Sequence, residues 1–452
     1  MSKFKCILVL LAAVILNGGC SEDDRYSDPF SGDRPSVNAE EFLAKAKPAE
    51  ETAAIPEIVA PVGELTLRQA LALTLMKNPE LKAFSLETRA AQARELQAGL
   101  WPNPELGVEV EKAGGTGASK RFDEAETTIQ LSQLIELGNK SQKRRKVASY
   151  AKELSRLDYQ SKHLEVFGDA AKAFFAVLEA QDKVRLSNDL LKLSQESYNV
   201  VEKRVDAGKD SPLERTRASV TMAKIRIEHR KIQRDLDFTR KRLASFWGQD
   251  DPRFALAAGK LDSIEKPGEI KKLLGQLKLN PEYTRWQAEI DKRKAALDLE
   301  RAKAIGDVTI GAGMKRLNET NNNTVLFGLS IPLPVSDRNQ GAREEAIINL
   351  VKANHEKKAA WIKLQNEFNL AYQELSDAYR LATALRDEVL PGATEMFDAA
   401  TKAYQQGKVD YLNVLDAQRT LFQVKNEYIE TLNVYHAAKT DIDRFINQPV
   451  KN

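Results

Sequence analysis

The strongest constraint on the fold is an internal repetition, because four landmarks recur in the same order about 200 residues apart. They pair KNPELKAF from Lys77 with LNPEYTRW from Leu279, ELGVEVEKAG near Glu105 with DVTIGAGMK near Asp307, TTIQLSQLIELGNKSQ from Thr127 with TVLFGLSIPLPVSDRNQG from Thr324, and RVDAGKDSPLERTRA around Gly208 with AYQQGKVDYLNVLDA around Gly407. Solenoid repeats measure about 20 to 50 residues. The spacing therefore indicates duplication of a large structural unit, with predicted repeats at 62–262 and 263–447.

We predict the same order of elements in each repeat. A capped helix comes first (Thr66 onward in the first repeat), followed by a helix that begins at NPE, two strands joined by a hydrophilic loop, and two long helices joined at a glycine. Three long intervals contain neither glycine nor proline: Leu213–Trp247, Ala342–Leu390 and Lys408–Gln448. At about 1.5 Å of rise per residue, a helix over the second interval would span roughly 70 Å. The last interval carries an apolar stripe for helix packing at Leu421, Val424, Tyr428, Leu432 and Tyr435. The predicted fold is mainly α-helical with a small β part.

The predicted strands are two-faced. Leu106, Val108 and Val110 alternate with small or acidic residues, and Val308 and Ile310 begin the same pattern in the second repeat. Four such strands match the length and pattern of membrane-crossing barrel strands, yet four strands cannot close a barrel. Open strand edges in a bilayer leave backbone groups unsatisfied, so membrane insertion would require several chains to pool their strands. On alternation alone, two hairpins of a small soluble β-domain fit equally well.

The first residues are typical of an exported protein. Lys3 and Lys5 precede the apolar run Ile7–Leu16, and LNGGC ends at Cys20. We predict a signal peptide at 1–19, a lipid anchor on Cys20 with an extended polar tether over 20–61, and a short C-terminal tail at 448–452. An ordinary secretory signal cut nearby is the alternative. Once the signal and the acylated Cys20 are set aside, the chain has no cysteine for a disulfide or thiolate metal site.

Enzyme chemistry is not indicated by any motif. The four histidines, His163, His229, His355 and His436, stand singly without the spacing of a zinc site. A phosphate-binding glycine loop and a nucleophile elbow are both missing from the sequence. The formal net charge of +3 gives no reason to expect nucleic-acid binding. We therefore predict no catalytic residues, no cofactor, no resident metal and no nucleic-acid partner.

Three segments carry a resemblance to a known family: LTLRQALALTLMKNPEL, IPLPVSDRNQG and AYQQGKVDYLNVLDAQRTLFQVKNEY. Together they resemble the TolC-like outer-membrane efflux factors, and PLPVSDRNQG resembles the CzcC-like branch associated with heavy-metal efflux. The resemblance implies a homotrimer whose strands form a twelve-stranded outer-membrane β-barrel, continued by a periplasmic α-helical tunnel. It also implies a lipid-anchored protein in the outer membrane of a Gram-negative bacterium. Its partners would be a periplasmic adaptor, an inner-membrane RND-type proton-driven pump and outer-membrane lipid.

The resemblance also assigns a junction between barrel and tunnel, formed by Pro332, Pro334, Arg338, Asn339 and Gly341. Proline at this point ends a strand ladder without needing a partner for its missing N–H. ELGNKSQKRRK would form the equivalent corner in the first repeat. For its basic residues two roles stay open, contact with anionic lipid headgroups or a solvated helix start; they are Lys140, Lys143, Arg144, Arg145 and Lys146.

The working site implied by the resemblance lies at the periplasmic hairpin tips. Gly208 and Gly407 would permit the sharp reversals there. A family carboxylate at the entrance matches Asp416, whereas Asn413 stands where a second one is found, and Glu214 is a further candidate. Three copies of Asp416 would favour cations by their negative potential; a plain solvated helix carboxylate is the alternative.

Taken together, these features predict the outer-membrane channel of a tripartite efflux system, a passive exit duct with heavy-metal cations as the expected cargo. Two alternatives remain. One is a drug or secretion duct of the same superfamily, and the other is a lipid-anchored periplasmic coiled-coil scaffold or adaptor without a channel.

Overall fold

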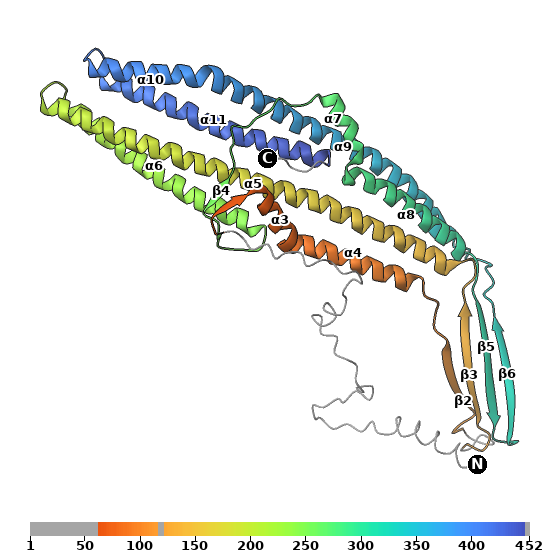
Figure 1. Ribbon diagram of the computed structural model, residues 1–452. Coiled ribbons are helices and arrows are strands. Elements are labelled where there is room, and N and C mark those ends of the chain that lie inside the picture. The colour runs from red at the N-terminus through yellow and green to blue at the C-terminus, as the bar shows by residue number, and fades with distance from the viewer. Residues whose placement is uncertain (1–61, 116–121, 448–452) are drawn as a thin grey trace, which may run out of the picture. The chain divides into compact units, whose positions relative to one another are not determined.

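The computed structural model describes residues 62–115 and 122–447, so the predicted signal peptide, Cys20, the tether and the C-terminal tail lie outside the described residues. The first repeat contains β1 (Glu64–Thr66), α3 (Leu67–Lys77), α4 (Pro79–Ala98), β2 (Glu105–Glu111), β3 (Glu126–Ile135), α5 (Lys140–Asp206), α6 (Pro212–Ser245) and β4 (Leu256–Ala258). The second contains α7 (Ile270–Gln276), η2 (Leu277–Leu279), α8 (Pro281–Lys303), β5 (Val308–Leu317), β6 (Asn322–Ser330), α9 (Gln340–Ala384), η3 (Leu385–Val389), α10 (Leu390–Gln405) and α11 (Tyr411–Phe445). The predicted mainly helical, duplicated fold is confirmed (Figure 1).

The duplication extends to single hydrogen bonds at the helix starts. The Asn78 side chain accepts from Leu81 N at 3.0 Å and donates to Phe246 O at 2.9 Å, at the end of α6. In the second repeat, Asn280 accepts from Glu282 N at 2.8 Å and donates to Phe445 O at 3.0 Å. Asparagine is among the best N-cap residues, and such a cap stabilises a helix by about 1 kcal/mol. Here the same side chain also ties the start of one helix to the end of a hairpin.

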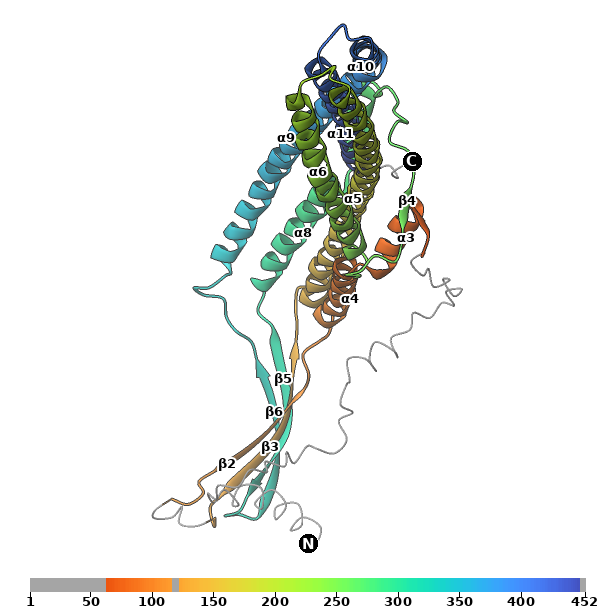
Figure 2. The ribbon, with the colours of Figure 1, turned by 90° about the vertical axis from the view of Figure 1, so that its left-hand side faces the viewer.

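The four long strands form one antiparallel sheet in the order β2-β3-β5-β6, so the two central strands come from different repeats. Leu106 lies opposite Leu131, Leu131 opposite Ala312, and Ala312 opposite Phe327, which fixes the register across the whole sheet. The sheet lies at one end of the long helices, and both hairpin tips lie at the other end (Figures 1 and 2). A short parallel pair, β1 with β4, was not predicted.

The long helix of the second repeat continues beyond its predicted end. Its pattern without glycine or proline stops at Leu390, but the helix passes through Pro391 and runs on to Gln405. A π-helical turn, η3, directly precedes the proline. Proline lacks the N–H that an α-helix needs and tolerates best a first-turn position, and the wider π turn provides that position. α5, the equivalent helix, has no such interruption between Lys140 and Asp206.

The core lies between the two hairpins at mid-length, where a connecting segment crosses them. Gln181 of α5 bonds both the N–H and the C=O of Ala257, at 2.7 and 3.0 Å. Tyr435 of α11 likewise bonds both backbone groups of Glu265, at 2.9 and 2.8 Å. His436 of α11 contacts the same connecting segment at Leu261 O, 2.9 Å away, and its ring stacks on Phe175 of α5. The segment between the repeats is thereby fixed to both hairpins.

Among the residues that the structure describes, none of the helices combines the length and the apolar character needed to cross a lipid bilayer.

Candidate functional site

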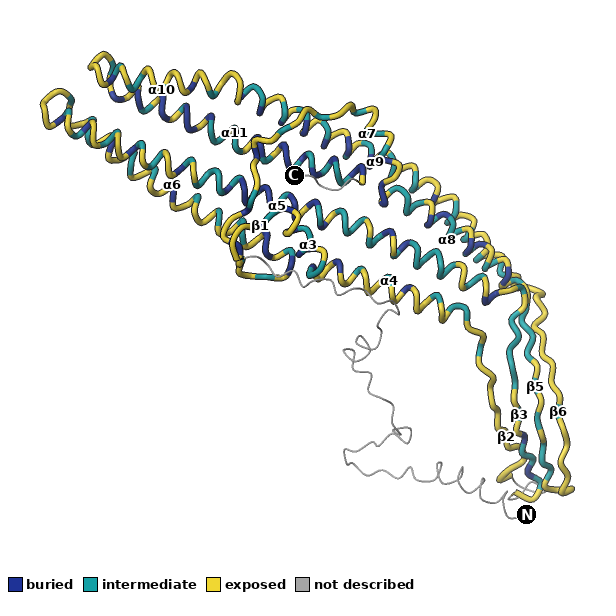
Figure 3. Tube along the Cα trace, viewed as in Figure 1, coloured by how far each residue is buried: buried dark blue, intermediate teal, exposed yellow. Residues whose placement is uncertain are grey.

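One face of the sheet is apolar and exposed. Because directly opposed residues share a face, the register gathers Leu106, Val108, Val110, Ile129, Leu131, Ile310, Met314, Val325, Phe327 and Leu329 on it. Phe327 is 85% exposed and Leu106 69% exposed, and every member of this group is counted among the exposed large hydrophobic residues. The edge strands β2 and β6 are almost entirely exposed, and the central strands β3 and β5 are mostly intermediate in burial (Figure 3). A contiguous apolar surface of this kind marks contact with a membrane or another protein.

The opposite face is mostly small or polar, with Leu134, Leu317 and Leu326 as its large apolar residues. It carries four glycines, Gly107, Gly311, Gly313 and Gly328, together with Gln130, Glu109 and Lys315. Lys315 bonds Glu111 at 2.8 Å and also pairs with Glu126. This alternation, apolar on one side and hydrophilic on the other, is the pattern of a strand between lipid and water.

The predicted junction connects β6 to α9. Pro332 packs on Gly306, where any Cβ would lie 2.8 Å from the proline Cγ, and Pro334 O accepts from Arg338 Nε at 3.3 Å. Asn339 has a left-handed conformation with φ 57° and opens α9, and its amide donates to Glu300 O and Oε2, both at 2.8 Å. Gly341 lies in the first turn of α9. The junction is thereby bonded to the last turn of α8 and packed on the connection between α8 and β5.

The first repeat uses the same device at its own corner. Asn139 precedes α5 with φ 57°, and Lys140 bonds Ile305 O at 2.6 Å and Asp307 Oδ1 at 2.7 Å. The Lys140 side chain is only 9% exposed. Both corners therefore converge on the short connection between α8 and β5.

These contacts exclude both roles left open for the basic cluster of the first corner at Lys140, its first member. Lys140 is neither a solvated helix start nor available to lipid, because it is a buried ion-pair partner of Asp307. Arg144 forms a two-pronged pair with Glu136, and Arg145 lies 3.7 Å from Glu95. The cluster acts structurally at Lys140 and Arg144, which join α5 to the segments beside the strands and to the end of α4, whereas Arg145 forms an exposed pair.

The hairpin tips have the same backbone geometry. Gly208 and Gly407 have φ values of 68° and 74°, which favour glycine, and each ends its helix with a pair of capping hydrogen bonds. Lys209 N donates to Arg204 O at 2.8 Å, and Lys408 N donates to Ala403 O at 3.0 Å. A positive-φ glycine with this bond is the Schellman helix ending. The structure thus places both glycines at the reversals where the sequence predicted them.

The two tips are joined through Asp210. Its carboxylate accepts two bonds from Arg204 within the first tip, at 2.8 and 3.0 Å, and one from the Tyr404 hydroxyl of the second, at 2.6 Å. The Arg204 guanidinium also lies 4.7 Å from the centre of the Tyr404 ring. The Arg204 bonds hold the pKa of Asp210 below its usual range, and burial, followed by the bond to Asp210, raises the pKa of Tyr404. We call these three residues the tip tie.

The three predicted entrance residues do not share one environment. Asn413 and Asp416 are both exposed and lie one turn apart on α11. Glu214 is partly buried on α6, bonds Arg217 at 2.8 Å and lies near Tyr411, whose pKa burial raises to about 12 with a further contribution from Glu214. The structure therefore groups Asp416 with Asn413 and places Glu214 in the packing between the hairpins.

The histidines lie on the helices and do not gather into a metal site within the described residues. His229 is buried and hydrogen-bonded to Ser187 at 2.9 Å, and the His163 ring packs at a tilt on Phe167 with ring centres 4.1 Å apart. Within residues 62–115 and 122–447, no three His, Cys, Asp or Glu side chains gather as metal ligands. The histidines whose contacts are known are therefore packing residues of the helices.

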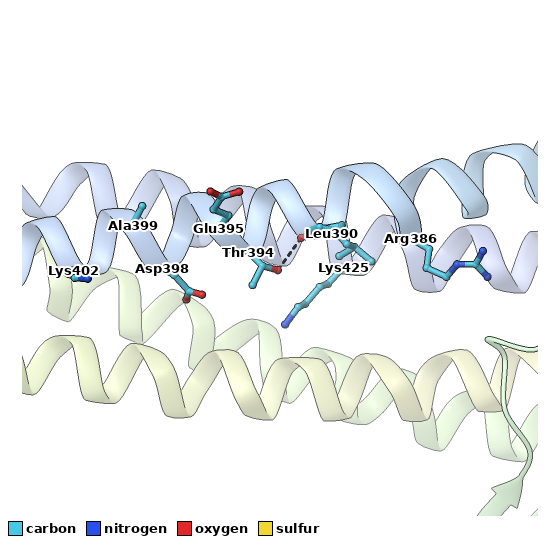
Figure 4. Close-up of a pocket in the computed structure, with 9 residues that line it drawn as sticks. Arg386, Leu390, Thr394, Glu395, Asp398, Ala399, Lys402 and Lys425 are labelled. Carbon is cyan, nitrogen blue, oxygen red and sulfur yellow. Dashed lines mark hydrogen bonds between the residues drawn. The ribbon is translucent and has the colours of Figure 1, made fainter.

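Sequence reasoning missed the tip tie and the π turn. Asp210 and Tyr404 are 194 residues apart, and the two tips differ there, because Val409 stands at the position equivalent to Asp210. A groove of about 750 Å³ beside the π turn was also missed; it is lined by Arg386, Leu390, Pro391, Thr394, Glu395, Asp398, Ala399, Lys402 and Lys425 (Figure 4). Pro391 was the available signal for this region.

Comparisons with known proteins agree on one family. The family described as "Outer membrane efflux protein" matches residues 70–249 and 276–448. The cobalt-zinc-cadmium resistance protein CzcC of Cupriavidus metallidurans is 36% identical over 386 residues, which cover 85% of this chain and 91% of that protein. The nickel-cobalt-cadmium resistance protein NccC of Alcaligenes xylosoxydans is 23% identical over 304 residues, 67% of each chain. A crystal structure of CusC shares the fold with a TM-score of 0.67 and 18% identity, over 89% of this chain and 100% of that one.

Proposed function

The chain belongs to the outer membrane efflux protein family, and we propose that three copies of it form a passive exit duct for metal cations. The observation that carries this proposal is the sheet. It has an exposed apolar face, a hydrophilic face with glycines, and two edge strands, β2 and β6, that pair on one side only. Such edges are costly in a bilayer unless they are paired. Pairing β6 of each copy with β2 of the next closes twelve strands into a barrel.

The helices supply the second part of the duct. α5, and α9 continued by α10, run from the junction to the tips, α6 and α11 return from the tips to mid-length, and many positions along these helices are exposed (Figure 3). We propose that three sets of these helices enclose a water-filled tunnel in the periplasm. The tips, farthest from the sheet, would receive the periplasmic adaptor and the RND-type inner-membrane pump. Acylation of Cys20 belongs to the same proposal.

The tip tie and Asp416 give the duct a gate in this proposal. The Asp210 carboxylate joins the two hairpins of one chain, so loss of these bonds would let α10 and α11 separate from α5 and α6. Asp416 is exposed close to the same end, and three copies around a narrow opening would concentrate negative potential. The tie therefore favours opening by movement of the tips, and the Asp416 carboxylates favour cations in the opening.

Metal cations are proposed as the cargo because of the relatives. CzcC is named for cobalt, zinc and cadmium resistance, and NccC for nickel, cobalt and cadmium resistance. A duct that only conducts would receive its cargo from the pump, so the choice of metal would lie with the partner.

Gene deletion tests the function and the cargo together. We expect the deletion strain to lose resistance to zinc, cobalt or cadmium, and a plasmid copy of the gene to restore it. Dyes and antibiotics serve as the comparison set. Sensitivity to these compounds with unchanged metal resistance would replace the metal duct by a drug duct. Unchanged growth under every condition, in a strain shown to express the protein, would contradict an efflux role.

A further inference from the structure

Gln418 is an anomaly in the packing of the hairpins. Its residue is only 3% exposed, and neither its side-chain oxygen nor its side-chain nitrogen has a hydrogen-bond partner. Among the described residues, Gln418 alone leaves two side-chain polar atoms buried and unpaired. A buried amide without partners raises the free energy of the packed state, because the same amide would be fully hydrated in water.

The neighbours of Gln418 explain why it finds no partner. One turn before it, Val414 packs in an apolar cluster with Val201 of α5 and Tyr404 of α10. One turn after it, Leu421 packs in a second cluster with Leu385 and Ala393. Phe397 of α10 packs against both clusters. The amide therefore lies between two apolar clusters, in the surface that α11 presents to α5 and α10.

A second orphan lies at the same end of the molecule. Glu214 Oε2 of α6 is buried without a partner, and Glu214 lies close enough to Tyr411 to influence its ionisation. Unpaired polar groups thus occur on both hairpins where they meet near the tips. The tip tie, by contrast, has all its charged groups paired in the same region.

We propose that Gln418 is a positioning residue of the gate, whose unpaired amide weakens the packing of α11 on α5 and α10 so that the hairpins separate readily once the tip tie is released. Separation hydrates the amide and removes its cost. The proposal rests on the duct proposed above. The tip tie and Gln418 have opposite effects. The tie stabilises the packed arrangement of the hairpins, and Gln418 lowers the stability of that arrangement so that the hairpins can separate.

The local structure of the second hairpin suits this role. The π turn and Pro391 interrupt helical hydrogen bonding between α9 and α10, and π turns are frequent at functional sites. The groove of about 750 Å³ brings water to α10 and α11 in the stretch that includes Lys402 and Lys425 (Figure 4). A small movement of α10 and α11 would therefore bring water to Gln418.

Two variants of nearly the same shape test the proposal in opposite directions. Gln418→Met removes the unpaired polar atoms, so the packed state gains stability. Gln418→Glu places a carboxyl group there, which is costlier to bury. We expect the open probability of single channels in planar bilayers to fall about tenfold for Gln418→Met and to rise for Gln418→Glu. Gln423, exposed on the same helix, provides matched controls as Gln423→Met and Gln423→Glu, which should leave gating unchanged.

Hydrogen–deuterium exchange gives a second readout on the full-length mature protein. Exchange over residues 198–220 and 400–422 should slow in Gln418→Met and accelerate in Gln418→Glu. A role in packing alone, such as fixing the register of α11, would make both variants loosen the tips, and that result would overturn the proposal. Unchanged gating and unchanged exchange in both variants would also overturn it. If the unmodified protein assembles but does not conduct, the duct fails while the exchange experiment still decides the role of Gln418.

Discussion

The strand end and the tip end of the helices are built on different principles. At the strand end, both repeats use the same left-handed asparagine, Asn139 and Asn339; the first corner bonds to Asp307 before β5, and the second bonds to Glu300 in the last turn of α8. At the tip end the repeats share the glycine-lysine turn and its backbone bonds, but the side chains that join the tips differ. The tie joins unlike residues, Asp210 of one repeat to Tyr404 of the other, and orphaned polar atoms lie nearby.

This difference indicates that the strand end must be rigid and that the tip end must be able to move. A strand leaving a bilayer must keep its direction relative to the helix that follows, and two copies of one device provide this. An end that opens needs bonds between its moving parts that can be released together, and identical repeats would not supply complementary partners. Divergence of the repeats at the tips is therefore consistent with a gate there.

The largest effect is expected from a charge on the apolar face of the sheet. Phe327→Lys places an ammonium group on the most exposed apolar position of β6, at about 2–4 kcal/mol per copy if that position faces lipid. The fraction of protein recovered in outer-membrane fractions as a trimer should collapse. The control is Thr324→Lys on the opposite face, which should insert normally. Equal losses in both variants would mean that the two faces do not divide lipid from water.

A smaller loss is expected at the first corner. Lys140→Met leaves Asp307 without its ion-pair partner, and removal of one member of a largely buried pair costs about 2–4 kcal/mol. Thermal unfolding of the purified protein should shift to lower temperature, and Lys140→Met combined with Asp307→Leu should recover part of the loss. Arg145→Met, at a 3.7 Å exposed pair, is the comparison and should have little effect. An unchanged unfolding temperature for Lys140→Met would mean that the Lys140–Asp307 pair does not stabilise the corner.

At the tips, Asp210→Asn should alter gating more than stability. It weakens the charge-assisted bonds from Arg204, and we expect open probability to rise by about tenfold. Asp206→Asn, one turn away at an exposed 3.2 Å pair with Arg215, is the matched control. Because the pKa of Asp210 is depressed in the tied state, the tie has its full strength above about pH 4 and weakens as pH falls through the depressed pKa. A gate that loosens between pH 5 and 8 would point to another group.

The smallest effect is expected from Asp416→Ala, which removes an exposed carboxylate without disturbing packing. Reversal potentials in a salt gradient should show weaker preference for cations, and block by divalent cations should be reduced. Asn413→Ala on the same exposed face is the control. Unaltered ion preference would remove Asp416 from the mechanism and leave the fold assignment untouched.

Local sequence patterns predicted the strands and the tips because each depends on nearby residues, whereas the junction was assigned by the family resemblance. Alternation identified both faces of the sheet, Gly208 and Gly407 marked the reversals, and Leu421 with its neighbours marked the buried stripe of α11. The tip tie was not predictable in this way, because it joins residues 194 positions apart. Gln418 was missed because a search for apolar stripes does not register a polar residue within the buried face.

The sharing of strands between copies is tested most directly by current through a planar bilayer. Purified full-length protein, shown to be trimeric by mass measurement in detergent, should produce discrete cation-selective conductance steps, and Phe327→Lys should produce none. A well-folded protein that stays monomeric and water-soluble after removal of its acyl group, and passes no current, would contradict the account.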